Sequence, residues 1–313
     1  MAMWVICQQC IVWQTLSMTQ TIKLPTKTNI LPALAVAGTV ISWAASFTAI
    51  GLALREMQPL PMASVRFALA SGLAVAWFLW RRSPGFSRRD LLIIMVCGVL
   101  GIASYNVLLN SGQATVSAGA ASFIVNTQPL FMVGLAVVFL KERFSIWAWV
   151  GALLALSGVA VIASGQPDGI TFGAGAMLIV GAAASAATYS VLQRPLLVRH
   201  DSISVTAAVI LAGAVALSPW LSTGVGQIAK ASLPTIGAVI FLAIAPAAIG
   251  QTCWTYALKS FGAARAGQFL YLIPPCAVFF AWAGLGEVPA LATLIGGALA
   301  LVGVITVNTL GRR

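Results

Sequence analysis

Acidic side chains are scarce in this chain: Asp and Glu together number six among 313 residues, and charged residues of both signs make up only 7% of the sequence. Hydrophobic residues make up 60%. So few charges cannot hydrate the surface of a soluble protein of this length, whereas a surface that faces lipid needs none. The composition therefore excludes a soluble globular domain and predicts an all-α polytopic membrane protein.

Groups that serve acid–base or metal chemistry are equally scarce. His200 is the single histidine, and the six acids lie in predicted loops or at the ends of apolar runs. A zinc site or a Ser-His-Asp triad needs several such groups close together. The phosphate-binding pattern G-x-x-x-x-G-K-[ST] is absent as well. We therefore expect no catalytic residue, no metal ion, no cofactor and no ATPase activity.

Cysteine is also too rare to form a framework of disulfides. Cys7 and Cys10 make a C-x-x-C pair, but no second pair and no neighbouring histidine completes a metal site. Both lie in the first thirty residues, where glutamines interrupt an apolar run that is too short to cross a bilayer. We expect residues 1–30 to form a disordered leader, with Met18 as an alternative translation start.

Long apolar runs, by contrast, are abundant. A helix needs about 20 apolar residues to cross the hydrocarbon core, and ten runs meet that length. They are Leu31–Leu54, Leu60–Trp80, Leu91–Asn110, Ser117–Leu140, Ile146–Ser164, Phe172–Gln193, Ile203–Leu221, Ile236–Leu258, Ala266–Leu285 and Leu291–Thr309. We number these predicted spans 1 to 10 in chain order.

The net charge of +11 follows the predicted topology. An even number of spans places both termini on one side. If that side is the cytoplasm, fourteen of the seventeen basic residues face it, Arg55 and Lys230 face the other side, and Arg66 lies inside span 2. Such a bias is the positive-inside pattern. The basic excess therefore indicates that both termini are cytoplasmic, and it implies no nucleic-acid partner. We expect the membrane to be a bacterial inner membrane.

The chain contains an internal repeat with an offset of 145 residues. The stretch Ala118–Glu142 recurs as Ala263–Glu287, so that Pro129 matches Pro274. We expect two five-helix units, residues 31–165 and 166–313. An odd number of crossings inverts the second unit, and inverted repeats place a substrate site between the halves. Because each matched proline frees a backbone carbonyl near mid-span, we interpret Pro129 and Pro274 as hinges, with static kinks as the alternative.

Four short motifs carry a family resemblance. They are Ser42-Trp43-Ala44 in span 1, Arg66-Phe67 in span 2, the run Ser117–Ser122 that opens span 4, and Leu140-Lys141-Glu142 that closes it. The duplicated unit resembles the EamA-type unit of the drug/metabolite transporter superfamily and, within it, the bacterial aromatic amino acid exporters. The resemblance covers about residues 30 to 310. It implies ten helices around a central cavity, with spans 5 and 10 at the periphery.

Polar and aromatic residues inside the spans are candidates for the substrate site, because polar groups in hydrocarbon are costly. The repeat pairs Asn106 with Gln251 and Asn126 with Tyr271. Alternatively, these amides only bond neighbouring helices. The predicted substrate-binding residues are Trp43, Tyr105, Asn106, Asn126, Gln251, Trp254, Tyr256, Gln268 and Tyr271.

Arg66 allows two interpretations. A lone cation inside a span is costly unless it pairs or reaches an interface. Glu56 lies ten residues before it and could form a structural salt bridge. The alternative is that Arg66 contacts an anionic group of the substrate.

These features together predict a transporter that exports amino acids, aromatic or otherwise apolar, or related small metabolites by alternating access. No acid or histidine lies deep in a span, so we expect a facilitative uniporter. The expected partners are a small-molecule substrate and the lipid bilayer, and we expect a monomer. The alternatives are a proton-coupled exporter of other metabolites or drugs, and a membrane receptor or scaffold that transports nothing.

Overall fold

The computed structural model describes residues 30–81, 85–140, 146–164 and 173–310. Across these ranges the chain consists of helices joined by short turns, and no strand occurs in them. The expected leader, residues 1–30, lies outside the described part apart from Ile30. Glu142 lies outside it too.

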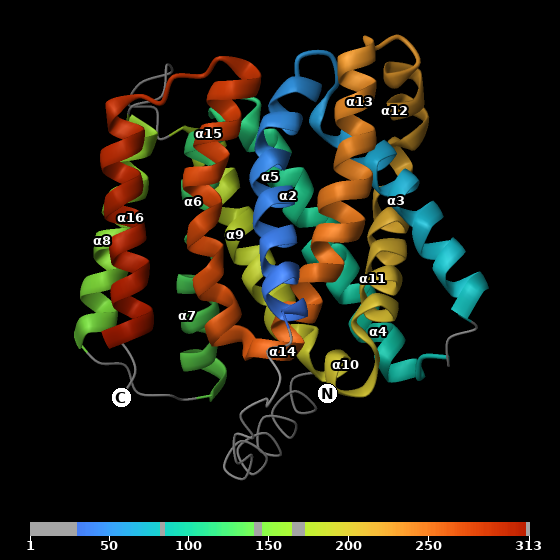
Figure 1. The fold of residues 1–313 in the computed structure, drawn as a ribbon, viewed down its shortest axis with the longest axis horizontal. Coiled ribbons are helices and arrows are strands. Elements are labelled where there is room, and N and C mark those ends of the chain that lie inside the picture. Colours follow the sequence, from blue (N-terminus) through green and yellow to red (C-terminus); the bar gives the residue numbers. More distant parts are fainter. Residues whose placement is uncertain (1–29, 82–84, 141–145, 165–172, 311–313) are drawn as a thin grey trace.

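The first half of the chain, up to Ser164, forms one run of helices (Figure 1). They are α2 (Leu31–Ala53), α3 (Pro59–Arg81), α4 (Arg88–Cys97), the π-helix η1 (Gly98–Ser104), α5 (Tyr105–Gln113), α6 (Ala118–Val125), α7 (Gln128–Leu140) and α8 (Ile146–Ser164). Side-chain oxygens cap two of these helices. Ser87 accepts from the Asp90 N–H at the start of α4, and Ser117 accepts from the Ala120 N–H at the start of α6.

The second half follows the same plan. Its helices are α9 (Ala174–Leu192), α10 (Arg194–Arg199), α11 (Ser202–Leu217), the 3-10 helix η2 (Ser218–Trp220), α12 (Leu221–Ile228), α13 (Leu233–Leu242), the π-helix η3 (Ala243–Gly250), α14 (Gln251–Phe269), the 3-10 helix η4 (Leu270–Leu272), α15 (Ile273–Leu285) and α16 (Leu291–Leu310). Asp201 caps α11 by accepting from the Ser204 N–H at 2.9 Å.

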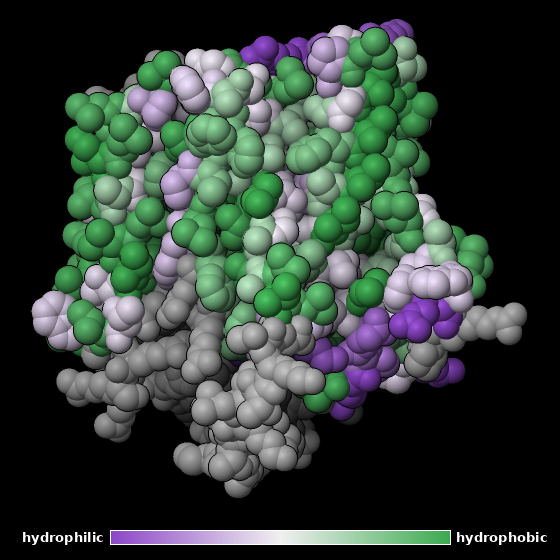
Figure 2. All heavy atoms as spheres, viewed as in Figure 1, coloured by the Kyte–Doolittle hydropathy of each residue, from purple (hydrophilic) through white to green (hydrophobic). Residues whose placement is uncertain are grey.

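The surface has the composition of a membrane protein. Six helical stretches of the described chain are long and apolar enough to cross a bilayer: Leu31–Ala53, Pro59–Arg81, Arg88–Gln113, Ala174–Arg199, Ser202–Ile228 and Leu233–Phe261. Shorter apolar helices span Trp149–Ile162, Leu270–Leu285 and Leu291–Thr306. Figure 2 shows a broad hydrophobic surface over the helices, with hydrophilic residues gathered at its upper and lower edges. Exposed leucines, isoleucines and valines are stable in this arrangement only if lipid covers them.

Irregular helical segments recur at equivalent places in the two halves. The π-helix η1 begins at Gly98 and η3 begins at Ala243, which is the same position of the repeat. The predicted span 4 is broken between α6 and α7 at Asn126 and Thr127. Its counterpart in the second half is η4, directly before Pro274. The π-helices and the helix breaks therefore belong to the repeated unit, because each occurs once in each half.

One boundary differs from the sequence prediction. A loop was expected between spans 8 and 9, at residues 259–265, but α14 continues as helix through this stretch to Phe269. The stretch contains no proline, so each of its residues has the N–H that a continuing helix needs. The break comes instead just ahead of Pro274, which lacks the N–H that a continuing helix would need.

Helices α8 and α16 pack against each other at one edge of the bundle (Figure 1). Glycines make this contact close: a Cβ atom on Gly158 would lie 2.5 Å from the Gly296 carbonyl oxygen, and one on Gly303 would lie 2.5 Å from that of Gly151. Small residues at such positions let helix backbones approach and gain van der Waals contact in a membrane. These helices are the predicted spans 5 and 10, and they lie apart from the cavity described next.

Candidate functional site

A cavity of about 80 Å³ lies between the two halves. Helices α2, α3, α5, α6 and α7 and the π-helix η1 line it from the first half. Helices α9, α14 and α15 with η3 and η4 line it from the second. Among the described residues that line it, Arg66 is the charged one, and none is Asp, Glu, His or Lys.

Two tryptophans from opposite halves form an aromatic wall of this cavity. The ring centroids of Trp43 on α2 and Trp254 on α14 lie 5.5 Å apart at an interplanar angle of 49°. Trp43 Nε1 donates to the Pro246 carbonyl at 3.2 Å, which holds the ring in place. Gly250 permits this packing, because a Cβ there would lie 3.0 Å from Trp43 Nε1. Aromatic pairs in such tilted geometry suit apolar parts of a ligand.

Arg66 lies on the same cavity with 6% of its surface exposed. Its Nε donates to the Leu242 carbonyl at 3.0 Å, and its Nη1 donates to Asn106 Oδ1 at 3.0 Å. In a regular α-helix the Leu242 carbonyl would accept from residue 246, but Pro246 has no N–H. The chain turns here into the π-helix η3, whose backbone bonds run to the fifth residue, and Arg66 adds a side-chain donor to the Leu242 oxygen.

The structure does not contain the salt bridge considered for Arg66 and Glu56. Glu56 accepts instead from the Ser232 backbone N–H at 2.7 Å and from its hydroxyl. Within the described part of the chain, no carboxylate lies within ion-pair distance of Arg66. The guanidinium is a buried cation held by neutral groups.

Gln251 bonds to a residue that the sequence did not single out. Gln251 Nε2 donates to the Tyr189 hydroxyl at 2.9 Å, and both residues line the cavity. Gly101 of η1 lies against the Tyr189 ring so closely that an added Cβ would come within 2.4 Å of it. A glycine at this point is thus required for the position of the tyrosine.

Asn126 occupies the break between α6 and α7. Its Nδ2 donates at 2.9 Å to the Leu270 carbonyl, which also accepts the Ile273 N–H at the end of the 3-10 helix η4. Among the described residues, buried Asn126 Oδ1 has no hydrogen-bond partner. Asn110 Oδ1 is in the same state, but Asn126 lines the cavity, where a ligand or water would supply the missing bond.

The structure brings together most of the predicted site residues. Trp43, Tyr105, Asn106, Asn126, Gln251 and Trp254 all line the cavity. Tyr256 and Tyr271 are partly buried but do not line it. The side chain of Gln268 lies outside the described part. Pro129 and Pro274 are buried at the starts of α7 and α15, next to the cavity and not on its wall.

Further lining residues escaped the sequence analysis. Gln128 Nε2 donates to the Ser190 hydroxyl at 3.2 Å, and Ser46 and Ser122 also face the cavity. Serine is common in membrane helices, and Tyr189 lies near the predicted end of its span, so neither type of residue gave a signal. Gln128, beside Pro129, was detectable as an amide next to a helix break.

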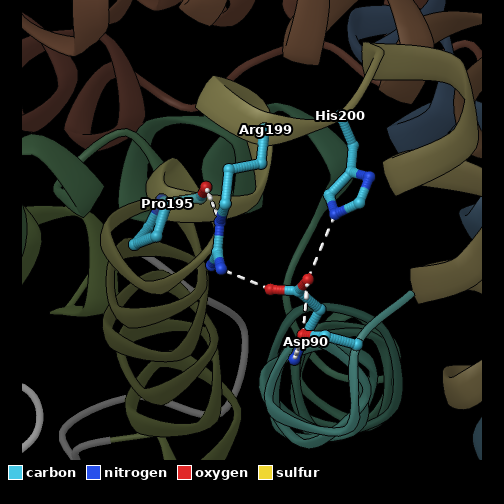
Figure 3. Close-up of polar contacts among 5 residues, drawn as sticks. Asp90, Pro195, Arg199 and His200 are labelled. Atoms are coloured by element: carbon cyan, nitrogen blue, oxygen red, sulfur yellow. Dashed lines mark hydrogen bonds and ion pairs between the residues drawn. The ribbon is translucent and has the colours of Figure 1, made fainter.

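A second polar cluster joins α4 and α10, which lie at the lower edge of the bundle in Figure 1, and its residues do not line the cavity (close-up in Figure 3). Asp90 Oδ1 forms an ion pair with Arg199 Nη2 at 2.8 Å, and His200 Nε2 lies 3.2 Å from Asp90 Oδ2. Ser87 also donates to Asp90 Oδ2, at 2.8 Å. The cluster joins the start of α4 to the connection between α10 and α11, and so it links the two halves outside the cavity.

No group of His, Cys, Asp and Glu among the described residues could hold a metal ion. The cavity offers one cation, amides, hydroxyls and aromatic rings, which bind polar and apolar parts of a small organic molecule. These are the features of a binding site.

Comparison with a solved protein supports the fold. A protein of known crystal structure superposes with a TM-score of 0.60 at 19% sequence identity, over 89% of this chain and 96% of that one. At this identity the match concerns the fold alone.

Curated relatives are transporters by name. A probable terminal-alkyne amino-acid exporter of Streptantibioticus cattleyicolor is 38% identical over 88% of this chain and 93% of its own length. An uncharacterized transporter of Archaeoglobus fulgidus is 32% identical over 85% of this chain and 94% of its own. The uncharacterized transporter YdfC of Bacillus subtilis is 31% identical over 84% of this chain and 86% of its own length. The model of the EamA-like transporter family matches twice, at residues 30–164 and 173–309. The chain is therefore a multi-pass membrane protein that belongs to the EamA-like transporter family.

Proposed function

We propose that this protein exports neutral amino acids with aromatic or other apolar side chains from the cytoplasm, by alternating access of the central cavity. The observation that carries the proposal is the composition of this cavity. It joins a buried guanidinium, several amides and an aromatic pair between two repeated halves. The curated name of the Streptantibioticus cattleyicolor relative, a probable amino-acid exporter, favours the same solute class.

The proposed architecture is ten membrane spans arranged as an inverted repeat of five and five, with units at residues 31–165 and 166–313. The two family matches support this division. In Figure 1, α2 begins at the lower edge of the bundle, whereas α9 ends there in α10, so the two units start at opposite faces. Alternating access follows if the halves rock about the cavity between them.

We further propose that the protein is a monomer in the bacterial inner membrane with both termini in the cytoplasm. The distribution of basic residues supports this orientation: Arg81, Arg88, Arg89, Arg199 and Lys259 all belong to the face on which both termini would lie.

The driving force in this proposal is the gradient of the solute itself. A proton-coupled carrier usually holds a titrating group at its site, and the described lining contains no carboxylate or histidine. Two acids outside the cavity have other partners. Glu287 Oε2 accepts from the Ala118 N–H at 3.1 Å, at the start of α6, and Glu56 binds Ser232.

Transport by the purified protein tests the function. Proteoliposomes are loaded with single radiolabelled amino acids from a panel of acidic, basic, aliphatic and aromatic kinds, and efflux is compared with that from protein-free liposomes. We expect faster efflux for neutral apolar amino acids, and a strong loss in Trp43→Ala protein that inserts normally. Efflux at the protein-free rate for the whole panel would overturn the proposal.

A further inference from the structure

We propose that Arg66 and Asn126 recognise the two charged groups of an α-amino acid: the substrate carboxylate binds the Arg66 guanidinium, and the substrate ammonium donates to Asn126 Oδ1. This inference rests on the proposed function and specifies its substrate class as the zwitterion. It makes Arg66 and Asn126 the residues that determine specificity.

The first argument is the state of Arg66. The side chain is buried on the cavity, and its described partners, Leu242 O and Asn106 Oδ1, are neutral acceptors. These two bonds use only part of the N–H groups of a guanidinium. A buried cation without an acidic partner is costly, and a carboxylate that binds it in bidentate fashion removes that cost. The pair with a substrate carboxylate would therefore be strong.

The second argument is the free oxygen of Asn126. The Leu270 carbonyl can only accept, so the amide nitrogen of Asn126 must face it, and Oδ1 is the amide atom left for another donor. That oxygen is buried without a donor in a residue that lines the cavity. An ammonium group has donors and no acceptor, and so it matches this oxygen.

The third argument concerns the rest of the lining. Apart from Arg66, the described lining carries no formal charge, and Trp43, Trp254 and Phe67 supply aromatic surface. A substrate with an uncharged, apolar side chain fits this surface. A second positive charge would lie close to Arg66 with no carboxylate nearby to offset it, so basic amino acids and cationic drugs are disfavoured.

The test compares one amino acid with two analogues that each lack one charge. The amide derivative keeps the ammonium and loses the carboxylate. The des-amino acid keeps the carboxylate and loses the ammonium. Initial efflux rates of all three compounds are measured for the wild type and for Arg66→Gln, Arg66→Lys, Asn126→Ala and Asn110→Ala, each normalised to inserted protein.

Asn110→Ala is the matched control. Asn110 is also a buried asparagine whose Nδ2 bonds across helices, to the Pro59 carbonyl at 3.5 Å, and whose Oδ1 has no partner. It does not line the cavity. A purely structural loss of an asparagine would therefore affect Asn110→Ala and Asn126→Ala alike.

In the wild type we expect the amino acid to move faster than either analogue. Arg66→Gln should lower the ratio of amino acid to amide by about 10- to 100-fold, the range for a hydrogen-bonded charged group, and Arg66→Lys should restore part of it. Asn126→Ala should lower the ratio of amino acid to des-amino acid by about 10-fold, while Asn110→Ala leaves both ratios unchanged.

If Arg66→Gln and Asn126→Ala each lowered the efflux rates of all three compounds by the same factor, the two residues would have only a structural role. That result would overturn the inference. A wild type that transports the amino acid no faster than its analogues would overturn it too, with the proposed function intact. A wild type that moves no amino acid at all would instead refute the proposed function.

Discussion

Two side chains at the cavity add hydrogen bonds to backbone oxygens beside helix irregularities. Arg66 donates to the Leu242 carbonyl, directly before the π-helix η3, and Asn126 donates to the Leu270 carbonyl in η4. A hydrogen bond of this kind contributes about 0.5–3 kcal/mol, more when the donor is charged, so each side chain stabilises the helix that it contacts. Arg66 and Asn126 therefore both stabilise a helix and supply polar groups to the cavity. Replacement of either residue should change the local helix geometry as well as the polarity of the cavity.

Substitution of Gly101 tests the contact between η1 and α9 directly. An added Cβ would come within 2.4 Å of the Tyr189 ring, so Gly101→Ala should displace Tyr189 and weaken its bond with Gln251. We expect a stability loss of about 1–3 kcal/mol, as for other overpacked cores, together with slower amino-acid efflux. Thermal unfolding of the detergent-solubilised protein and proteoliposome efflux measure the two effects.

Gly72→Ala is the control for this change, because Gly72 lies in α3 with nothing within 4 Å of an added Cβ. The thermal stability of Gly72→Ala should equal that of the wild type or exceed it slightly, since alanine has a higher helix propensity than glycine. Equal behaviour of the two variants would show that the contact with Tyr189 is unimportant.

Glu56 gives a pH dependence outside the membrane spans. Donation from the Ser232 hydroxyl and then from its backbone N–H lowers the pKa of the Glu56 carboxyl below its ordinary value. The carboxylate thus contributes stability that is present above the ordinary glutamate pKa and is lost as the pH falls through the lower folded pKa.

We expect the wild type to lose slightly more thermal stability than Glu56→Gln between pH 6 and roughly pH 3.5, the range in which a glutamate protonates. The difference should be small because Glu56 is exposed. Ser232→Ala keeps only the backbone donor to Glu56, so its loss of thermal stability should lie between those of the wild type and Glu56→Gln. Identical pH profiles for the wild type and Glu56→Gln would contradict this role.

At the scale of helices, we expect the irregular segments to be the places where the bundle changes shape. The π-helices η1 and η3 lie at matching places, and so do the breaks before Pro129 and Pro274. Wide turns and broken helices often mark functional sites, because their backbone bonds are already rearranged. All four segments border the cavity, so a change of shape there would open or close it.

The hinge interpretation of Pro274 is testable by restoring its N–H. In Pro274→Ala the restored N–H can donate to the Leu270 carbonyl in competition with the Ile273 N–H and Asn126, which would replace the tight turn of η4 by α-helix running from α14 into α15. We expect substrate binding to persist while the efflux rate falls several-fold, because the rocking step is impeded. Binding is measured by thermal shift with the amino acid and transport by efflux. An unchanged efflux rate would identify the proline as a static kink.

The helices were largely predictable from the sequence, because apolar runs of bilayer length leave few alternatives. Residues Trp43, Asn106 and Gln251 were predictable as polar or aromatic groups in apolar surroundings, and the structure places all three on one cavity. The bond between Arg66 and Asn106 was not, since it depends on helix rotation and not on spacing along the chain. Tyr256 of α14 and Tyr271 of η4 belong to elements that border the cavity, but neither is among its lining residues.

At the scale of the whole molecule, the proposed orientation can be tested by labelling. If both termini lie in the cytoplasm, as proposed, the connection that contains Gly85 is cytoplasmic as well. We expect a cysteine introduced at Gly85 to resist an impermeant thiol reagent in intact cells and to react after the membrane is permeabilised. A cysteine at Lys230, on the opposite face, should react in intact cells. The reverse pattern would invert the proposed orientation.

The central claim is that this protein moves neutral amino acids down their own gradient. The most direct measurement is the uptake of a radiolabelled neutral amino acid by proteoliposomes that hold the same unlabelled amino acid at an equal concentration. It is made with no ion gradient, with a pH gradient and with a sodium gradient. The account predicts that label equilibrates faster than in protein-free liposomes in all three conditions and that total amino acid never rises above the external concentration. Uptake no faster than in protein-free liposomes, or accumulation above the external concentration under either ion gradient, would contradict it.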